Sequence, residues 1–314
     1  MLQQTQVATV IPYYEKFLKS FPTVGHLARA DLSKVLRAWE GLGYYSRARN
    51  LHQTAKIISD DLRGKLPDTL EGLLRLPGIG RYTAGAILSI AFNKEAPILD
   101  GNVKRVLSRI FAISGDPREV KTEQRLWEIS GSLIPKRRAC SFNQALMELG
   151  AMVCTPKGPL CLLCPVQDFC RARALGNPEG YPQKARKKMI PHVEAVSAVI
   201  RKEGKVLLQR RPPKGLLGGL WEFPNWKLEN RKDPRKSLKD HLRKEMKTIA
   251  KVGDLVGTFK HTYSHFKLTL HVYGCQTPDD KTHGRWVPVG NLHLFPMSRL
   301  HRRIADKIAG EIGR

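Results

Sequence analysis

The sequence contains no apolar run that approaches the roughly 18 residues of a membrane span, and its first residues lack the basic-then-apolar pattern of a secretory leader. Acidic residues are scarce as well: 28 Asp and Glu stand against 54 Lys and Arg, a formal net charge of +26. We therefore expect a cytoplasmic protein without a membrane partner. The positive charge predicts nucleic acid as the partner, because cationic side chains release counterions from phosphates, with a solubilising surface charge as the alternative.

Cysteine is rare, and its distribution is uneven. Four of the six cysteines share one short stretch with the spacing C-x6-C-x2-C-x5-C: Cys154, Cys161, Cys164 and Cys170. Structural disulfides are uncommon in cytosolic proteins. Four thiolates this close together can reach one metal centre, and four-cysteine ligation suits either zinc or an iron–sulfur cluster. The sequence therefore predicts a metal site in residues 154–170.

The hydrophobic pattern divides the 314 residues into two parts, as expected at about 150 residues per domain. Apolar residues recur at three- and four-residue steps through the first half, which predicts helices at 7–18, 27–39, 45–58, 70–76, 84–90 and 103–111. After residue 192 the period changes to two. Strands are expected at 195–200, 205–209 and 266–273, and helices at 237–249 and 300–312.

The pattern weakens between these two parts. Residues 176–192 contain glycines, prolines and the basic run 184–188, which is typical of a linker. The predicted organisation is therefore a helical domain over 1–175, a basic linker over 176–192, and a mixed α/β domain over 193–314.

A glycine-containing turn lies between two predicted helices, at Leu76-Pro77-Gly78-Ile79-Gly80. Two glycines at this spacing let the backbone approach a phosphate, and the helix after them offers free N–H donors. We interpret residues 70–90 as a candidate helix–hairpin–helix that binds DNA through Gly78 and Gly80. An ordinary turn between helices is the alternative.

Asp100 directly precedes the predicted helix 103–111. It could serve only as the N-cap of that helix. A carboxylate at a helix N-terminus can also face a developing sugar cation. Asp100 is therefore a candidate catalytic residue.

These motifs together resemble the endonuclease III-like DNA glycosylase superfamily. The segments Met1-Leu2-Gln3-Gln4-Thr5, Trp39-Glu40-Gly41-Leu42-Gly43-Tyr44-Tyr45 and Leu99-Asp100-Gly101-Asn102 are more narrowly similar to adenine DNA glycosylases of the MutY type. The resemblance implies an α plus α+β fold: a helical helix–hairpin–helix glycosylase domain with an iron–sulfur loop, followed by a Nudix-like α/β domain. It also implies a four-iron, four-sulfur (4Fe–4S) cluster on the four clustered cysteines.

The resemblance further implies a function in base excision repair. Such an enzyme acts as a monomer in the bacterial nucleoid, flips adenine that is paired with 8-oxoguanine or guanine out of duplex DNA, and hydrolyses its glycosidic bond. Asp100 then stabilises the sugar cation. Tyr82 stands where bifunctional relatives carry a Schiff-base Lys, so monofunctional base excision is expected.

The resemblance also implies which residues contact the DNA lesion. Gln4 and Tyr44 match residues that enter the base stack, Thr5 beside them is a further candidate DNA contact, and Ser264 and His265 match the loop that senses 8-oxoguanine. An ordinary strand-entry loop is the alternative for Ser264.

One expected residue is absent from the sequence. Family members carry a catalytic Glu two residues before the Met that is residue 1 here. We expect this Glu upstream of Met1, in a longer chain of which this sequence is a part. The alternative is a lesion-binding protein with impaired catalysis, since protonation of the leaving base is worth about 10²–10⁴ in rate.

Overall fold

The protein is described from a computed structural model that covers residues 1–314 except 4, 184–188, 229–232, 279–283 and 313–314. Gln4 and the basic run 184–188 therefore lie outside the described residues. The chain folds into two compact units. Residues Lys65–Lys188 form one, here called the inserted unit, and Met1–Gly64 with Met189–Arg314 form the other, the split unit. The domain boundaries at 175 and 193 rest on sequence pattern alone and stay a prediction.

The split unit begins with four helices: α1 (Val7–Ser20), α2 (Val24–Arg29), α3 (Leu32–Ala38) and α4 (Ser46–Asp60). The single helix predicted over 27–39 is wrong, because the chain becomes extended at Ala30 and starts again at α3. Asp31 causes this restart: its carboxylate accepts a hydrogen bond from Ser33 N at 2.7 Å and caps α3.

The split unit continues with a seven-stranded sheet, whose longest path runs β3-β2-β1-β6-β5 while β4 pairs with β1 and β7 with β2. Its strands are β1 (His192–Lys202), β2 (Lys205–Arg210), β3 (Trp221–Glu222), β4 (Asn225–Lys227), β5 (Lys251–Thr262), β6 (Lys267–Gln276) and β7 (Arg285–Pro288). The predicted strands 195–200, 205–209 and 266–273 correspond to β1, β2 and β6. The turn between β1 and β2 holds Glu203 and Gly204 at φ +49° and +71°.

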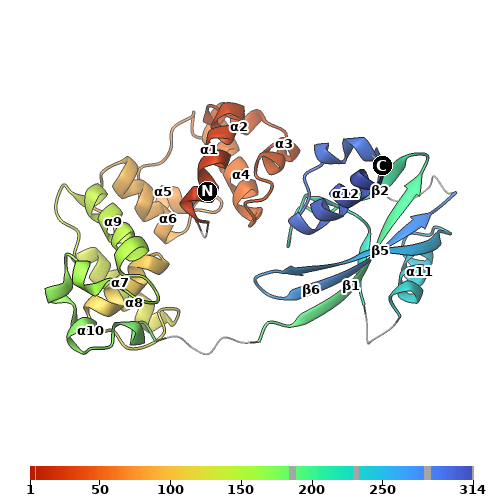
Figure 1. Ribbon diagram of the computed structural model, residues 1–314. Coiled ribbons are helices and arrows are strands. Elements are labelled where there is room, and N and C mark those ends of the chain that lie inside the picture. Colours follow the sequence, from red (N-terminus) through yellow and green to blue (C-terminus); the bar gives the residue numbers. More distant parts are fainter. Residues whose placement is uncertain (4, 184–188, 229–232, 279–283, 313–314) are drawn as a thin grey trace. The chain divides into compact units, whose positions relative to one another are not determined.

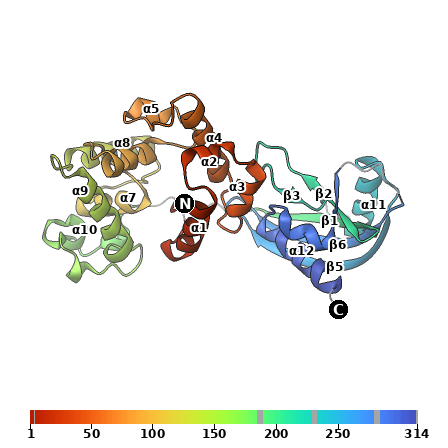
Figure 2. The same cartoon turned by 90° about the horizontal axis from the view of Figure 1, so that it is seen from above.

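Both faces of this sheet are buried. Ala195 and Val199 of β1 belong to the core under α12 (Arg299–Ile312), whereas Val196, Ala198 and Ile200 belong to the core under α11 (Pro234–Lys244). This two-sided burial explains the nearly continuous apolar run of β1. Figures 1 and 2 show α11 and α12 beside the sheet, with the short helix η6 (Val289–Leu294) before α12.

Helix α11 is shorter than expected. It ends at Lys244 and not at Ile249, and Lys247 has a positive φ of +50°. Thr248 lies buried beyond the helix, where its hydroxyl shares a 2.9 Å hydrogen bond with Thr277. This tertiary contact requires a backbone that a continuing helix does not provide.

The four N-terminal helices share a hydrophobic core with a loop of the C-terminal part. Leu220 is buried among the residues of these helices, and Leu217 packs against the same cluster. Arg49 of α4 donates to the carbonyl of Gly218 at 2.9 Å. Residues 1–64 are therefore packed around a side chain that follows them by more than 150 positions.

The inserted unit is helical in its described part. Its elements are α5 (Leu70–Leu74), α6 (Arg81–Ala86), η1 (Ile87–Ala91), α7 (Gly101–Ile110), α8 (Val120–Ser132), α9 (Ala139–Glu148), η2 (Leu149–Val153), η3 (Cys161–Leu163), η4 (Gln167–Phe169), α10 (Arg171–Ala174) and η5 (Pro178–Gly180). The apolar stripe of α7 contributes Val103, Val106 and Leu107 to its core. None of the described helices of the chain combines the length and apolar character that a membrane crossing requires.

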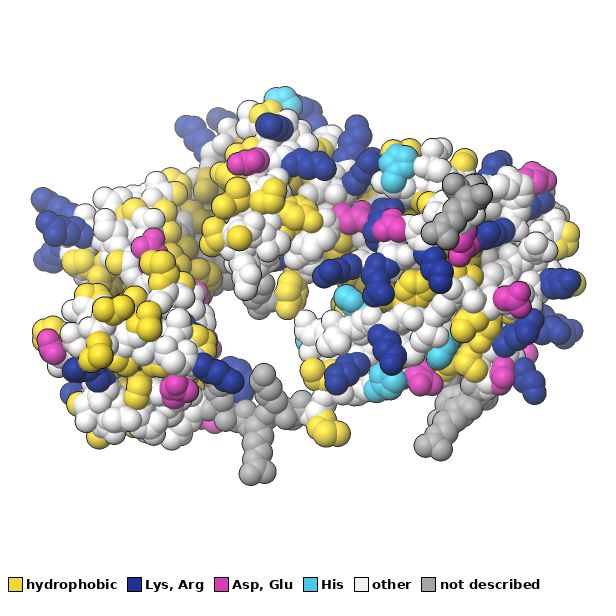
Figure 3. All heavy atoms as spheres, viewed as in Figure 1, with side chains coloured by type: hydrophobic (Ala, Val, Ile, Leu, Met, Phe, Trp, Pro, Cys, Tyr) yellow, Lys and Arg dark blue, Asp and Glu magenta, His cyan; other side chains and the backbone are white. Residues whose placement is uncertain are grey.

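Lys and Arg side chains, dark blue in Figure 3, are spread widely over the visible surface, and Asp and Glu side chains are fewer. On the face that Figure 3 shows, positive side chains therefore outnumber negative ones.

Candidate active site and nucleic-acid interface

Asp100 lies at the start of α7 and caps it. Its Oδ1 accepts a hydrogen bond from Val103 N at 2.7 Å. The extended segment before it is held by side chains of two other helices: Ser130 donates to the carbonyl of Ile98, and Asn143 to that of Ala96. The position of the Asp100 carboxylate is therefore set by its own helix and by the anchored segment that precedes it.

Gly85 of α6 lets this helix pack closely against the segment before Asp100. A Cβ at Gly85 would lie 2.1 Å from the carbonyl oxygen of Pro97. Only glycine lets α6 pack directly against the segment that leads to Asp100.

Tyr82 lies on α6, near Asp100. Its hydroxyl donates to Met147 Sδ at 3.5 Å. Burial raises the pKa of the Tyr82 hydroxyl, and the charge of Asp100 raises it further. The structure thus brings together the two residues predicted to act at the reacting sugar.

The turn between α5 and α6 has the predicted hairpin form. Gly78 has φ +78°, a conformation that favours glycine, and the Ile79 amide donates to the Leu76 carbonyl at 3.2 Å. Gly80 caps α6 at φ −93°, and a Cβ there would meet no described atom within 4 Å. The backbone conformation accounts for Gly78 but does not account for Gly80.

The four clustered cysteines line one pocket of about 300 Å³, part of which is open to solvent. Burial raises the pKa of the Cys164 thiol, and the charges of the other three thiols raise it further. The described residues contain no group of three His, Cys, Asp or Glu side chains placed to hold a single metal ion. The four thiols are therefore neighbours around one space.

Two arginines of α7 connect Asp100 with this cysteine loop. Arg105 donates through Nη2 to Asn102 Oδ1 at 2.9 Å and through Nε to the Cys154 carbonyl at 2.7 Å. Arg109 is 2% exposed and donates to Cys154 Sγ at 3.3 Å. Its remaining N–H groups bind the carbonyls of Thr155, Pro156 and Tyr181. The loop is thereby fixed to the helix that Asp100 caps.

The split unit holds the other predicted DNA contacts. Tyr44 is 50% exposed at the tip of a turn between α3 and α4, with φ +46° between Gly43 at +72° and Tyr45. The Trp39 indole donates to the Gly43 carbonyl at 3.1 Å. The turn therefore presents an aromatic ring to solvent from a constrained backbone.

Arg47 joins this turn to the N-terminal segment. Its guanidinium donates to the carbonyls of Met1 and Gln3 and to Thr5 Oγ1, the last at 3.2 Å. It also lies 5.5 Å from the centre of the Tyr44 ring. Thr5 and Tyr44 thus share one anchoring side chain.

Ser264 and His265 lie in the exposed turn between β5 and β6, which is closed by a 2.8 Å hydrogen bond from Tyr263 N to the Phe266 carbonyl. Ser264 Oγ shares a 3.3 Å hydrogen bond with the Tyr44 hydroxyl. The structure therefore joins Tyr44 and Ser264, two residues predicted to contact the lesion that are 220 positions apart. His265 lies near them only because it belongs to the same turn as Ser264.

Comparison with known proteins agrees with both halves of the chain. Residues 1–131 match the HhH-GPD superfamily of base excision DNA repair proteins, and residues 195–307 match the NUDIX domain. The chain is 38% identical to the adenine DNA glycosylase of Homo sapiens over 99% of its own length and 67% of that protein. It is also 38% identical to the adenine DNA glycosylase of Buchnera aphidicola subsp. Schizaphis graminum, over 98% of this chain and 88% of that protein.

This chain belongs to the adenine DNA glycosylases. It is a DNA N-glycosylase of base excision repair, as predicted from its motifs. A solved thermostable thymine-DNA glycosylase is 28% identical and superimposes with a TM-score of 0.51 over 55% of this chain and 80% of that chain. The predicted fold class, a helix–hairpin–helix domain followed by a Nudix-like domain, is confirmed.

Sequence reasoning missed several residues that hold this adenine glycosylase site together. Arg105 and Arg109 are four residues apart on α7, so their side chains lie on one face of the helix. This spacing could have indicated that the face contacts a negatively charged group inside the protein. Glu40 belongs to the motif at 39–45, but its partner Arg302 is 262 positions away. No local pattern indicates that second pairing.

Proposed function

We propose that this adenine DNA glycosylase excises adenine opposite 8-oxoguanine or guanine in double-stranded DNA, and that it does so without strand cleavage. The observation that carries the proposal is the placement of Asp100, capped on α7 beside Tyr82. A carboxylate held there can stabilise the positive charge that develops on the sugar as the glycosidic bond breaks.

Tyr82 determines the fate of the DNA strand after base release. Its hydroxyl is directed to Met147 and it has no amine. A Schiff base with the sugar requires an amine. We therefore assign to Tyr82 a place beside the sugar and expect free adenine with an intact DNA strand as the products.

Cys154, Cys161, Cys164 and Cys170 hold a 4Fe–4S cluster in this proposal. The residues fit such a group, because all four thiols line one space and cysteine thiolates are the usual ligands of iron–sulfur clusters. Held by these four thiolates, such a cluster would cross-link the loop 154–170 internally, while Arg105 and Arg109 attach the loop to α7. Arg109 contributes a buried positive charge beside the thiolates.

DNA binding is assigned to the hairpin and to the turns of the split unit. At Gly80 the protein leaves open space where a side chain would stand, which favours close approach of a DNA phosphate. Thr5 and Tyr44, together with Gln4, enter the base stack. Ser264, with His265 beside it in the turn, contacts the base opposite adenine.

The test is single-turnover release of adenine from duplexes that carry adenine opposite 8-oxoguanine, guanine or thymine. It is run on this chain and on a form extended upstream through the expected Glu. Asp100→Asn is the matched variant in both forms, because Asn also caps helices. We expect release from the first two duplexes and a loss of about 10²-fold or more with Asp100→Asn.

Two outcomes would change the proposal. Equal release opposite thymine would remove the specificity for the mismatch. Specific binding without release by either form would favour the alternative of a lesion-binding protein.

A further inference from the structure

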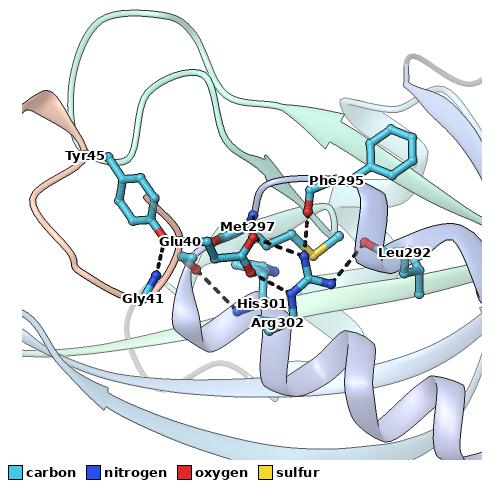
Figure 4. Close-up of polar contacts among 9 residues, drawn as sticks. Glu40, Gly41, Tyr45, Leu292, Phe295, Met297, His301 and Arg302 are labelled. Atoms are coloured by element: carbon cyan, nitrogen blue, oxygen red, sulfur yellow. Dashed lines mark hydrogen bonds and ion pairs between the residues drawn. The ribbon is translucent and has the colours of Figure 1, made fainter. Parts of the chain in front are cut away.

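An ion pair joins the turn that carries Tyr44 to the last helix of the chain. Glu40 Oε1 accepts from Arg302 Nε at 2.6 Å, and Glu40 Oε2 accepts from Arg302 Nη2 at 3.3 Å (Figure 4). The two side chains are only 18% and 20% exposed. A two-point pair of this kind fixes direction as well as distance, because the planar guanidinium and the carboxylate meet edge to edge.

Backbone contacts strengthen the same junction. Met297 N donates to Glu40 Oε2 at 3.4 Å, and the Met297 carbonyl accepts from the Tyr45 hydroxyl at 3.0 Å. The Gly41 amide in turn donates to that hydroxyl at 3.4 Å (Figure 4). Residues on both sides of Tyr44 are therefore attached to residues 297–302.

A second connection leads from the same segment to Ser264. Burial raises the pKa of the Tyr263 hydroxyl, and the Ser298 side chain beside it acts in the opposite direction; Tyr263 directly precedes Ser264. Ser264 then contacts the Tyr44 hydroxyl. The contacts form a closed ring: from Glu40 to Arg302, along the start of α12 to Tyr263 and Ser264, and back through Tyr44.

We propose that the Glu40–Arg302 pair is a positioning element for lesion recognition, which holds Tyr44 and Ser264 together for the base opposite adenine. This inference rests on the proposed function, in which these two residues contact that base. Glu40 and Arg302 themselves touch no DNA in this proposal. They act by keeping the ring of contacts closed.

A substitution of Glu40 can break this ring of contacts without displacing Arg302. Arg302 also donates to the carbonyls of Leu292 and Phe295, at 3.0 and 2.6 Å. These bonds keep its guanidinium in place when Glu40 changes. Glu40→Gln therefore removes the charge of the pair while retaining the size of the side chain and the packing of α12.

The experiment measures equilibrium binding to duplexes in which an uncleavable adenine analogue lies opposite 8-oxoguanine or guanine. Glu40→Gln is compared with Glu311→Gln, which breaks the 2.9 Å pair between Arg201 and Glu311 inside the C-terminal part. We expect Glu40→Gln to reduce the preference for 8-oxoguanine about 3- to 10-fold, the size of one lost hydrogen bond. Glu311→Gln should leave the preference unchanged.

A double variant tests the route through Ser264. If the pair acts by positioning Ser264, Glu40→Gln lowers the preference in the original chain but not in Ser264→Ala, because coupled residues are not additive. Additive losses in the double variant, an unchanged preference in Glu40→Gln, or an equal weakening for both duplexes would overturn the proposal.

A readout without DNA separates this inference from the proposed function. If the original chain shows no preference for 8-oxoguanine, the proposed lesion recognition is wrong. In that case, amide hydrogen exchange of the free protein tests whether the Glu40–Arg302 pair has a positioning role. Faster exchange in residues 40–47 and 262–266 of Glu40→Gln than of Glu311→Gln supports its positioning role, and equal exchange contradicts it.

Discussion

The two compact units hold their functional residues in different ways. In the inserted unit, Asp100 and the cysteine loop are joined by α7 itself, through a helix cap and two arginines within about 55 residues of sequence. In the split unit, Tyr44 and Ser264 come from segments 220 positions apart and meet through side chains. The first arrangement depends on local backbone, whereas the second depends on long-range contacts that single substitutions can remove.

Loss of the Arg109 side chain tests the local arrangement most severely. Arg109→Met removes the donors to the Cys154 thiol and to three loop carbonyls while keeping an apolar side chain of similar length. We expect the free energy of unfolding to fall by about 3 kcal/mol, because four partly buried acceptors lose their charged donor at once. Denaturant unfolding and iron content measure the effect. The exposed Arg125 of α8 supplies the control Arg125→Met, and equal stability of the two variants would contradict the prediction.

A drop in pH tests the long-range arrangement at His301, the neighbour of Arg302. Burial lowers the pKa of His301 to about 3, and its Nδ1 accepts from Phe223 N at 3.2 Å. The unfolded chain therefore binds a proton between about pH 6.5 and 3 that the folded chain does not. Stability should fall with pH in this window, by about 2 kcal/mol between pH 7 and 5 from this group.

The variant His301→Gln isolates this effect. Burial raises the pKa of the nearby Glu222, which acts in the opposite direction because its protonation then favours the folded state. The difference in pH slope between the original chain and His301→Gln, followed by thermal unfolding, reports His301 together with its 3.6 Å contact to Glu222. Identical slopes would show that this histidine takes up its proton without unfolding.

Substitution of Gly80 tests whether its open space serves DNA. Gly80→Ala adds a methyl group at a φ that alanine accepts, so the fold should be retained. We expect binding to all duplexes to weaken about tenfold through a lost phosphate contact. Gly310→Ala, which also adds a methyl group to open space, should leave affinity unchanged. If the two variants have equal affinities for DNA in a salt titration, Gly80 belongs to an ordinary turn between helices and has no role in DNA binding.

The smallest effect is expected at Ser264. Ser264→Ala removes the hydroxyl that contacts Tyr44 and should narrow the preference for 8-oxoguanine over guanine about 3- to 10-fold. Overall affinity should change little, because phosphate contacts supply most of it. The neighbouring Thr262→Ala is the control. A uniform loss for both duplexes would assign Ser264 to general DNA binding.

Features governed by local chemistry were predictable from the sequence. The helix after Asp100 follows from its apolar stripe, and the β1–β2 turn follows from Glu203-Gly204. The four cysteines were expected to share one site, and they line one pocket. In each of these cases the determining residues lie within a short stretch of the chain.

Features governed by distant contacts were not predictable. Periodicity alone extended one helix through Asp31 and another past Lys244, because the cap at Asp31 and the buried pair Thr248–Thr277 compete with helix continuation. The pairing of Glu40 with Arg302 has no local signal at all, since either residue resembles an ordinary surface charge until the fold brings them together.

The burial of Leu220 among the N-terminal helices has a consequence for synthesis on the ribosome. Residues 1–64 emerge before Leu220, because the leucine that completes their core is made 156 residues after Gly64. At about 5–20 residues per second, this delay lasts on the order of 8–30 s. During that time the nascent helices carry an unfilled apolar site, while the whole inserted unit emerges. Residues 1–64 therefore reach their native packing only after the inserted unit has been made, and a chaperone that covers apolar surface would act on them.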